Sequence, residues 1–170
     1  EEFGSKISNL KQIWITGGEP FMDDSIYKFF TLLKKYCDIS KIYVVVNSNA
    51  SKIDISKIYS LLEVKKLLLN ISVDSTGHLY QYMRGYHYTF EELDEKMKKI
   101  NGLKKKYKNL DVSVNGAYHI YNILDIENFF EWGISVTDPK AGKIEYRVLQ
   151  GPSWLRARNA PVQIKSRAKA

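Results

Sequence analysis

Short runs of apolar and β-branched residues alternate along the chain with stretches in which apolar residues recur every three or four positions. The first pattern predicts β-strands and the second predicts amphipathic helices. The predicted strands cover residues 13–16, 42–46, 67–73, 112–117 and 144–149. Five helices are predicted. The first is capped by Asp23 or Asp24, the second contains Ile58, Leu61 and Leu62, and the third is capped by Thr89. The last two cover residues 126–132 and 162–168. Because strands and helices alternate at intervals of about thirty residues, the pattern favours an α/β fold with a parallel sheet and right-handed crossovers.

The most regular helical pattern follows Thr89. Thr89 and Glu92 have the spacing of a capping box, in which each residue satisfies a backbone N–H near the helix start. The apolar positions after Thr89 share one side of the helix: Phe90, Leu93, Met97, Ile100 and Leu103. The aromatic stretch before it (Tyr80, Tyr82, Tyr86, His87 and Tyr88) is predicted to be a loop that either packs against the protein or gates a substrate.

Polar residues gather on one face of the later strands and at strand ends. Asn70, Ser72 and Asp74 alternate with apolar residues, so they share a face, and Ser113 and Asn115 do the same on the next strand. Asn47 and Asn49 gather at the C-terminal end of the second predicted strand. Burying such groups unpaired would cost about 1–3 kcal/mol each, and parallel α/β folds bind ligands at the carboxyl ends of their strands. We therefore expect a wet or ligand-filled cavity. The alternative is that neighbouring backbone satisfies these side chains.

The first predicted strand ends in the sequence Thr-Gly-Gly-Glu-Pro at residues 16–20. Two adjacent glycines let the backbone bend sharply and let a ligand approach main-chain groups closely. Glu19 places a charge at this turn, and Pro20 prevents the strand from continuing.

This turn resembles the Gly-Gly-Glu-Pro motif of radical S-adenosylmethionine (SAM) enzymes. Residues 46–50 resemble the Thr-Asn-Gly strand end of that family, and residues 71–77, followed by Met83-Arg84-Gly85, resemble its Ser-Leu-Asp-Gly … Arg-Gly stretch. Gly151-Pro152 and residues 159–161 resemble the loop after the sixth strand in members with a short "twitch" extension. The resemblance implies a partial (β/α) barrel with a parallel sheet, of which the second to sixth strands are present.

The resemblance also implies which residues bind SAM: Gly17, Gly18, Glu19, Asn49, Ser72, Asp74, Arg84 and Asn115. In that family, main-chain oxygens at the glycine turn bind the methionyl ammonium. Ser72, Asp74 and Asn115 would bind ribose hydroxyls or the methionyl end, and Arg84 would pair with the SAM carboxylate. Two alternatives stay open: Asp74 caps a local turn, and Arg84 is a surface arginine. No catalytic acid or base is predicted.

The chain has one cysteine, Cys37, so it has no metal site built from several cysteines. Cys37 is expected to be a small, partly buried residue at a helix end. Radical SAM enzymes hold a 4Fe–4S cluster with the three cysteines of a CxxxCxxC loop. The resemblance therefore implies that residues 1–170 are one core domain, truncated before the cluster loop and, we expect, also at the C-terminus. We expect such a fragment to be inactive alone.

The formal net charge is +7. Most lysines are spread over predicted helix faces, which are usually solvated, but a basic cluster occurs near the C-terminus: Arg156, Arg158, Lys165, Arg167 and Lys169. This cluster supports an alternative prediction, an RNA-associated domain, although no nucleic-acid-binding motif accompanies it. Another alternative is a noncatalytic α/β domain that binds a nucleotide-like ligand.

The preferred interpretation is the SAM-binding part of a radical SAM enzyme, which cleaves SAM reductively to a 5′-deoxyadenosyl radical that abstracts hydrogen. The resemblance implies an electron donor such as flavodoxin or ferredoxin and a substrate that is a small molecule, a peptide or RNA. No apolar run approaches the roughly 20 residues of a membrane span, so we expect no membrane partner and a location in the reducing cytoplasm.

Overall fold

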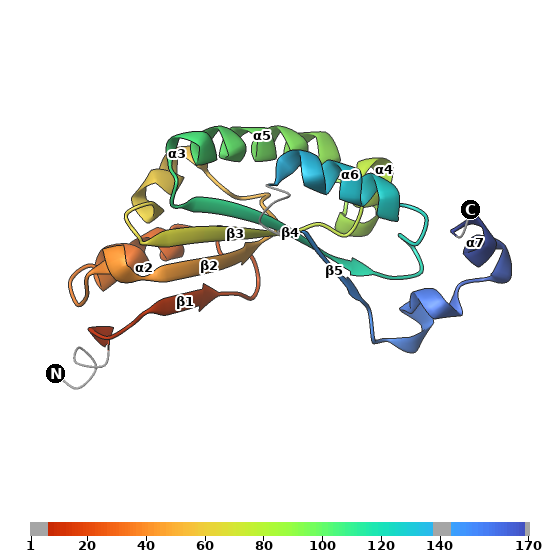
Figure 1. The fold of residues 1–170 in the computed structure, drawn as a ribbon, viewed down its shortest axis with the longest axis horizontal. Helices are drawn as coiled ribbons and strands as arrows, with labels where there is room; N and C mark the ends of the chain where they lie inside the picture. The colour runs from red at the N-terminus through yellow and green to blue at the C-terminus, as the bar shows by residue number, and fades with distance from the viewer. Residues whose placement is uncertain (1–6, 138–143, 169–170) are drawn as a thin grey trace. The chain divides into compact units, whose positions relative to one another are not determined.

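The computed structural model describes residues 7–137 and 144–168. Its sheet has five strands, in the order in which they occur along the chain (Figure 1): β1 (Gln12–Ile15), β2 (Tyr43–Ser48), β3 (Lys66–Ser72), β4 (Leu110–Tyr118) and β5 (Ile144–Val148). The strands pair in parallel, with Ile13 opposite Val44 and Val46 opposite Leu69. The predicted α/β fold with a parallel sheet is therefore confirmed.

The described helices follow the strands in alternation (Figure 1): α2 (Ser25–Leu33), α3 (Ile55–Ile58), α4 (Gly77–Arg84), α5 (Phe90–Lys106), α6 (Ile126–Val136) and α7 (Val162–Arg167). Short 3-10 turns cover Ile39–Lys41, Tyr59–Leu61, Ser153–Leu155 and Ala157–Asn159. No helix among the described residues is both long enough and apolar enough to span a membrane.

The prediction of a loop before α5 is wrong in part, because α4 occupies its first half. Tyr80 lies on α4 and is only 2% exposed, and its burial raises the pKa of its hydroxyl to about 12. The helix has only 8 residues, about two turns, so its hydrophobic period repeats too few times to be recognised in the sequence.

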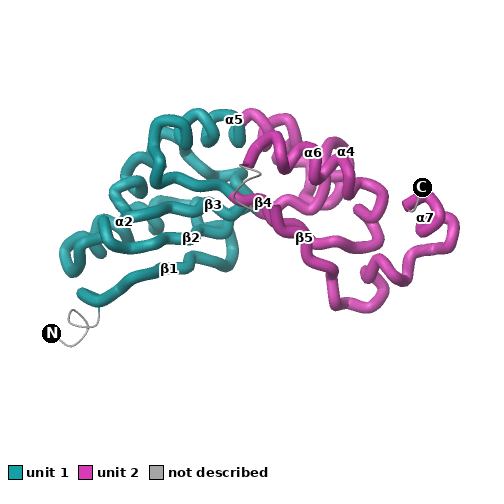
Figure 2. The backbone as a smooth tube through the Cα atoms, in the orientation of Figure 1, with its two compact units in different colours: residues 1–71, 96–112 teal, residues 72–95, 113–170 magenta. Residues whose placement is uncertain are grey.

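The chain divides into two compact units (Figure 2). Unit 1 comprises residues 1–71 and 96–112, and unit 2 comprises residues 72–95 and 113–170. In unit 1, the core is built from strand residues that alternate with more exposed ones. Leu67, Leu69 and Ile71 of β3 are fully buried, and Phe30 of α2 and Met97 of α5 are also in this core.

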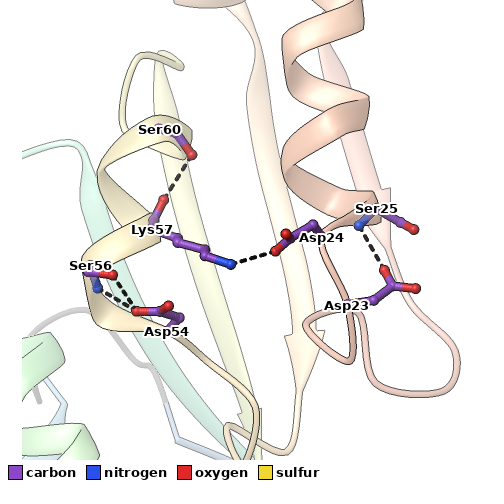
Figure 3. Close-up of polar contacts among 7 residues, drawn as sticks. All are labelled: Asp23, Asp24, Ser25, Asp54, Ser56, Lys57 and Ser60. Atoms are coloured by element: carbon purple, nitrogen blue, oxygen red, sulfur yellow. Dashed lines mark hydrogen bonds and ion pairs between the residues drawn. The ribbon is translucent and has the colours of Figure 1, made fainter.

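Acidic residues fix the starts of two helices in unit 1 (Figure 3). The Asp23 carboxylate accepts a hydrogen bond from the Ser25 amide at 2.7 Å, and Asp54 accepts from the Ser56 amide at 2.9 Å. These bonds satisfy amides that have no partner within the helix. Asp24, the other predicted cap of α2, instead forms an ion pair with Lys57 at 2.7 Å.

Unit 2 holds the capping box that the sequence predicts for α5. The Thr89 amide donates to Glu92 Oε2 at 2.7 Å, and the Glu92 amide donates to Thr89 Oγ1 at 3.1 Å. Elsewhere in unit 2, the rings of Phe129 and Tyr146 stack with centroids 4.4 Å apart. Gly116 on β4 is required there, since a Cβ atom would lie 2.4 Å from the Val73 carbonyl oxygen.

Candidate functional site

The glycine turn after β1 presents its main chain to open space. Gly17 and Gly18 have positive φ angles of 89° and 51°. Residues other than glycine rarely adopt such angles. A Cβ atom placed on either glycine would have no neighbour within 4 Å. The turn therefore leaves main-chain groups accessible to a ligand, as the sequence predicts.

The carboxylate of Glu19 is bound by the protein itself. Its Oε1 accepts hydrogen bonds from Ser48 Oγ at 2.6 Å and from the Phe21 amide at 3.2 Å. Its Oε2 accepts from the Asn49 amide at 2.8 Å. Glu19 thus joins the end of β1 to the end of β2 and brings two predicted site residues, Glu19 and Asn49, together in unit 1.

Ser48 is a part of this arrangement that the sequence analysis does not single out. Its hydroxyl donates to Glu19 and accepts a hydrogen bond from the Ala50 amide at 2.9 Å. Ala50 has a positive φ of 64°, unusual for a residue with a side chain. The signal in the sequence is the resemblance of this strand end to Thr-Asn-Gly, in which Ser48 takes the place of the threonine and Ala50 that of the glycine.

Neighbouring side chains satisfy part of the polar face predicted for β3. Asn70 lies opposite Asn47 on β2, and its amide nitrogen donates to Asn47 Oδ1 at 2.9 Å. The alternative interpretation, in which neighbouring groups satisfy the polar residues, therefore applies to Asn70.

In unit 2, the structure brings together Asp74 and Arg84, to which the sequence assigns separate roles. Asp74 Oδ2 forms an ion pair with Arg84 Nη2 at 2.6 Å, and Asp74 Oδ1 accepts from the Ala117 amide at 2.9 Å. The side chains of Asp74 and Arg84 are 21% and 31% exposed, so solvent screens this pair only in part. Asp74 is therefore not the simple turn cap considered as an alternative.

Asp125 takes the local role that was considered for Asp74. Its Oδ2 accepts a hydrogen bond from the Thr76 amide at 2.7 Å, and its Oδ1 accepts from Thr76 Oγ1 at 3.0 Å. These contacts hold the start of α4, which carries Arg84 at its other end. A carboxylate 49 residues away along the chain fixes this turn, so no local sequence pattern could identify the partner.

Asn122 is a further residue of this site that sequence reasoning missed. It is fully buried, and its amide nitrogen donates to the Asp74 carbonyl at 2.5 Å and to the Ala117 carbonyl at 2.8 Å. Its Oδ1 accepts from the His119 amide at 2.8 Å. The Tyr146 hydroxyl donates to the same Asp74 carbonyl at 3.1 Å. Asp74 is thus held by its neighbours through both main chain and side chain.

His119 lies beside this network and is 7% exposed. Its Nδ1 accepts a hydrogen bond from the Tyr121 amide at 3.2 Å, which requires that nitrogen to be unprotonated. Burial lowers the pKa of His119, and the Asp74 carboxylate opposes this shift to a smaller degree. The imidazole is therefore neutral at pH 7.

Ser72 and Asn115 have half-buried side chains that form no hydrogen bond with any residue in the described ranges 7–137 and 144–168. The Val73 amide donates to the Asn115 carbonyl at 2.8 Å, so the two residues lie on adjacent chain segments of unit 2. Polar side chains that are partly buried normally find partners. Both side chains are thus available to a polar ligand.

The residues of this chain do not fit an iron–sulfur cluster. The Sγ of Cys37, which is half-buried at the end of α2, donates to the Leu33 carbonyl at 3.5 Å. Burial, and secondarily Asp38, raises the pKa of its thiol, whereas a cluster requires thiolates. Across the described part of the chain, no group of three His, Cys, Asp or Glu residues could hold a metal ion.

A separate groove of about 700 Å³ occurs in unit 1 beside α2 and α3, and it contains none of the predicted site residues. Lys28, Lys35, Lys57 and Asp24 are among the residues that line it. The buried hydroxyl of Tyr27, another lining residue, has no hydrogen-bond partner among the residues that the structure describes. Burial raises the pKa of this hydroxyl to about 12.

Residues 1–132 match the sequence model of the Radical SAM superfamily. Among solved structures, the fold is similar to native anSMEcpe with bound AdoMet, with a TM-score of 0.61 and 18% identity over 85% of this chain and 39% of that chain. It is also similar to native anSMEcpe with bound AdoMet and Kp18Cys peptide, with a TM-score of 0.57 and 17% identity over 80% and 37% of the two chains. This chain therefore spans less than two-fifths of these proteins. No curated protein sequence matches it significantly.

Proposed function

Because this chain belongs to the radical SAM superfamily, we propose that it is the SAM-binding part of an enzyme that cleaves SAM reductively. Members of this family use SAM and a 4Fe–4S cluster, which supplies the electron for cleavage. The products are methionine and a 5′-deoxyadenosyl radical, and the radical abstracts a hydrogen atom from a substrate.

In this proposal, residues 1–170 form a single core domain of a longer protein, and three cysteines of a CxxxCxxC loop precede Glu1. The need for such a loop follows from the poor fit of Cys37 to a cluster. The fragment alone would bind SAM but would not cleave it. A flavodoxin or ferredoxin would supply electrons in the cytoplasm, where reducing conditions preserve free thiols.

The observation that carries the proposal is the glycine turn after β1. Its main chain is open at Gly17 and Gly18, so carbonyl oxygens there can accept hydrogen bonds from the methionyl ammonium of SAM. Glu19 acts as a positioning residue, because its carboxylate is already bound to Ser48 and Asn49 at the end of β2. Its charge orders the turn, and it also favours a cation nearby.

Residues of unit 2 are assigned to the rest of SAM. The unpaired side chains of Ser72 and Asn115 bind ribose hydroxyls. Arg84 has N–H donors beyond the one that pairs with Asp74, and these bind the SAM carboxylate. Asp74 orients Arg84, and its remaining lone pairs can accept from a ribose hydroxyl.

The proposal is tested with the full-length protein, reconstituted with iron and sulfide under anaerobic conditions and reduced with dithionite. We expect 5′-deoxyadenosine to form from SAM, as measured by liquid chromatography. Ser72→Ala and Asn115→Ala should each raise the Kd for SAM by about three- to tenfold, the effect of losing one hydrogen bond. Ser60→Ala, an exposed residue of unit 1, should leave the Kd unchanged.

Two results would contradict the proposal in different ways. Absence of 5′-deoxyadenosine from a protein with a fully assembled cluster would contradict cleavage. If SAM still bound to that protein, the chain would instead be a noncatalytic ligand-binding domain. Equal effects of Ser60→Ala and Ser72→Ala on the Kd would contradict the residue assignment.

A further inference from the structure

The C-terminal part of the chain is one of its strongly basic segments. The last 25 residues, 146–170, contain six Lys or Arg residues and no Asp or Glu. The first 145 residues contain the other 20 of the 26 basic residues and all 19 acidic ones, so their net charge is only +1. We refer to residues 146–168, the described part of this stretch, as the basic segment.

Most of the cations in the basic segment have no anionic partner. Arg147 pairs with Glu145, but Arg156, Arg158, Lys165 and Arg167 form no ion pair with any described residue. Some lysines elsewhere do have such partners, as Lys34 has Glu63 and Lys57 has Asp24. Within residues 7–137 and 144–168, therefore, no carboxylate pairs with these four cations.

The basic segment is folded onto unit 2 and is not a loose tail. Ala157 and Ala160 are buried in a small apolar cluster with Ile123, against which Ile120 and Ile164 pack. The Ile120 amide donates to the Leu155 carbonyl at 2.9 Å, which ties the segment to the chain after β4. Cations on such a fixed backbone bind a ligand with a smaller loss of conformational entropy than cations on a disordered tail.

Arg156 and Arg158 line a pocket of about 230 Å³ at the end of β5. The pocket is formed by Val148, Leu149, Gln150, Arg156, Ala157 and Arg158. Arg156 Nε donates to the Gln150 carbonyl at 2.5 Å, which holds the guanidinium in place and leaves its other N–H donors for a ligand. No Asp or Glu lines this pocket, so it suits an anion, and paired arginines match the oxygens of a phosphate.

A large exposed aromatic side chain accompanies the pocket. Trp154 is 71% exposed and lies two residues before Arg156, in the 3-10 turn Ser153–Leu155. An exposed tryptophan among unpaired cations is typical of surfaces that bind single-stranded nucleic acids, where bases stack on aromatic rings and cations contact the phosphates.

We propose that the basic segment is a binding site for single-stranded nucleic acid, in which the Arg156–Arg158 pocket takes a backbone phosphate and Trp154 stacks on a base. Arg167 on α7 adds a further phosphate contact. This site does not depend on SAM, since it contains none of the residues assigned to that cofactor. The same charge would attract an acidic protein. A pocket beside an exposed tryptophan, however, matches the phosphate and base of a nucleotide and not the carboxylates of an acidic protein.

The test measures binding of the 170-residue chain to a fluorescein-labelled single-stranded RNA of 12 nucleotides and mixed sequence, by fluorescence anisotropy at several NaCl concentrations. Release of about one counterion for each of the cations Arg156, Arg158, Lys165 and Arg167 predicts a slope near −3 for log K against log[NaCl]. Arg158→Gln/Arg167→Gln should weaken binding about tenfold at 100 mM NaCl and make the slope shallower by about 1.4. The double variant Arg158→Lys/Arg167→Lys, which keeps both charges, should bind the RNA with nearly the affinity of the wild type.

Two matched controls separate local from diffuse effects. Lys99→Gln/Lys105→Gln removes the same charge from exposed positions of α5 and should change affinity less than twofold. Trp154→Ala should weaken binding about tenfold at every salt concentration with no change in slope. Trp14→Ala, which removes an equally exposed tryptophan from β1, should have no effect.

The proposal is overturned if the RNA does not bind, or if the α5 control loses as much affinity as the Arg variant. It is also overturned if poly-glutamate or duplex DNA competes as well as the single strand, since the site would then prefer an acidic protein or any polyanion. Loss of SAM binding without loss of RNA binding would affect only the function proposed above.

Discussion

At the scale of single residues, the buried imidazole of His119 shows how packing determines a protonation state. Its Nδ1 accepts from the Tyr121 amide, and its backbone amide donates to Asn122. A proton on Nδ1 would remove the first of these bonds and would place a charge in a site that is 7% exposed. Both effects favour the neutral form.

The pKa of His119 in the folded protein should therefore lie below its ordinary value of 6.5. Below that value the unfolded chain binds a proton that the folded chain does not, so acid favours unfolding. The stability that His119 contributes is fully present above pH 6.5 and is lost as the pH falls from 6.5 through the folded pKa. NMR titration of the imidazole and urea unfolding at pH 5 to 7.5 measure the two quantities.

His119→Asn provides the control for this prediction, because the amide oxygen of asparagine can accept from the Tyr121 amide without titrating. The free energy of unfolding of this variant should vary less with pH between 5 and 6.5 than that of the wild type. A His119 resonance that titrates at or above pH 6.5, or an unchanged pH dependence in the variant, would contradict the assignment.

At the scale of secondary-structure elements, the close approach of chain segments at Gly116 limits what β4 can carry. A Cβ at Gly116 would lie 2.4 Å from the Val73 carbonyl oxygen and 2.6 Å from a ring carbon of Tyr146. Real Cβ atoms do not approach this closely, and the first neighbour is backbone. The Tyr146 ring cannot yield easily either, because it is stacked on Phe129.

Gly116→Ala should destabilise the protein by about 1–3 kcal/mol, the usual effect of overpacking. Gly102 in α5 provides the matched substitution, since a Cβ there meets nothing within 4 Å. Gly102→Ala should stabilise the protein by about 0.5–1 kcal/mol through its higher helix propensity. Urea unfolding should thus show opposite shifts of the midpoint, and shifts of the same sign would refute the steric explanation.

The same elements show which features the sequence can predict. The alternation in β3 was predicted because Leu67, Leu69 and Ile71 are regularly spaced and buried on one face. The capping box of α5 is predictable because Thr89 and Glu92 are only three residues apart in the sequence. Helix α4 is not predicted because its 8 residues form only about two turns.

The parts of the candidate site that were missed depend on contacts between residues far apart in sequence. Asn122 reaches the Asp74 carbonyl, 48 residues away, and Asp125 reaches Thr76, 49 residues away. The ion pair between Asp74 and Arg84 depends on α4, which was not predicted. The glycine turn is easier to identify, because the positive φ angles of its backbone require two adjacent glycines, which are visible in the sequence.

At the scale of the whole molecule, the two proposed ligands use different residues. SAM is assigned to positions between Gly17 and Asn115, and nucleic acid is assigned to the basic segment. Substitutions in one set should therefore leave the binding of the other ligand unchanged. The free energy of unfolding measures the binding of either ligand, because any ligand that binds only the folded state raises it.

This linkage gives a test of the role assigned to Arg84. SAM at 100 times its Kd for the wild type should raise the free energy of unfolding by about 2.7 kcal/mol. If Arg84→Met raises the Kd tenfold by removing the partner of the SAM carboxylate, the gain at the same concentration falls to about 1.4 kcal/mol. Each gain compares one variant with and without SAM, so the loss of the ion pair with Asp74 cancels.

Arg147→Met is the matched control, because Arg147 also pairs with an acidic residue but is assigned no role in binding SAM. Its gain should stay near 2.7 kcal/mol at the same SAM concentration. Thermal or urea unfolding of the three proteins, each with and without SAM, measures the difference. An equal reduction in both variants would mean that the positive charge of the protein, and not the position of Arg84 beside Asp74, determines the affinity for the SAM carboxylate.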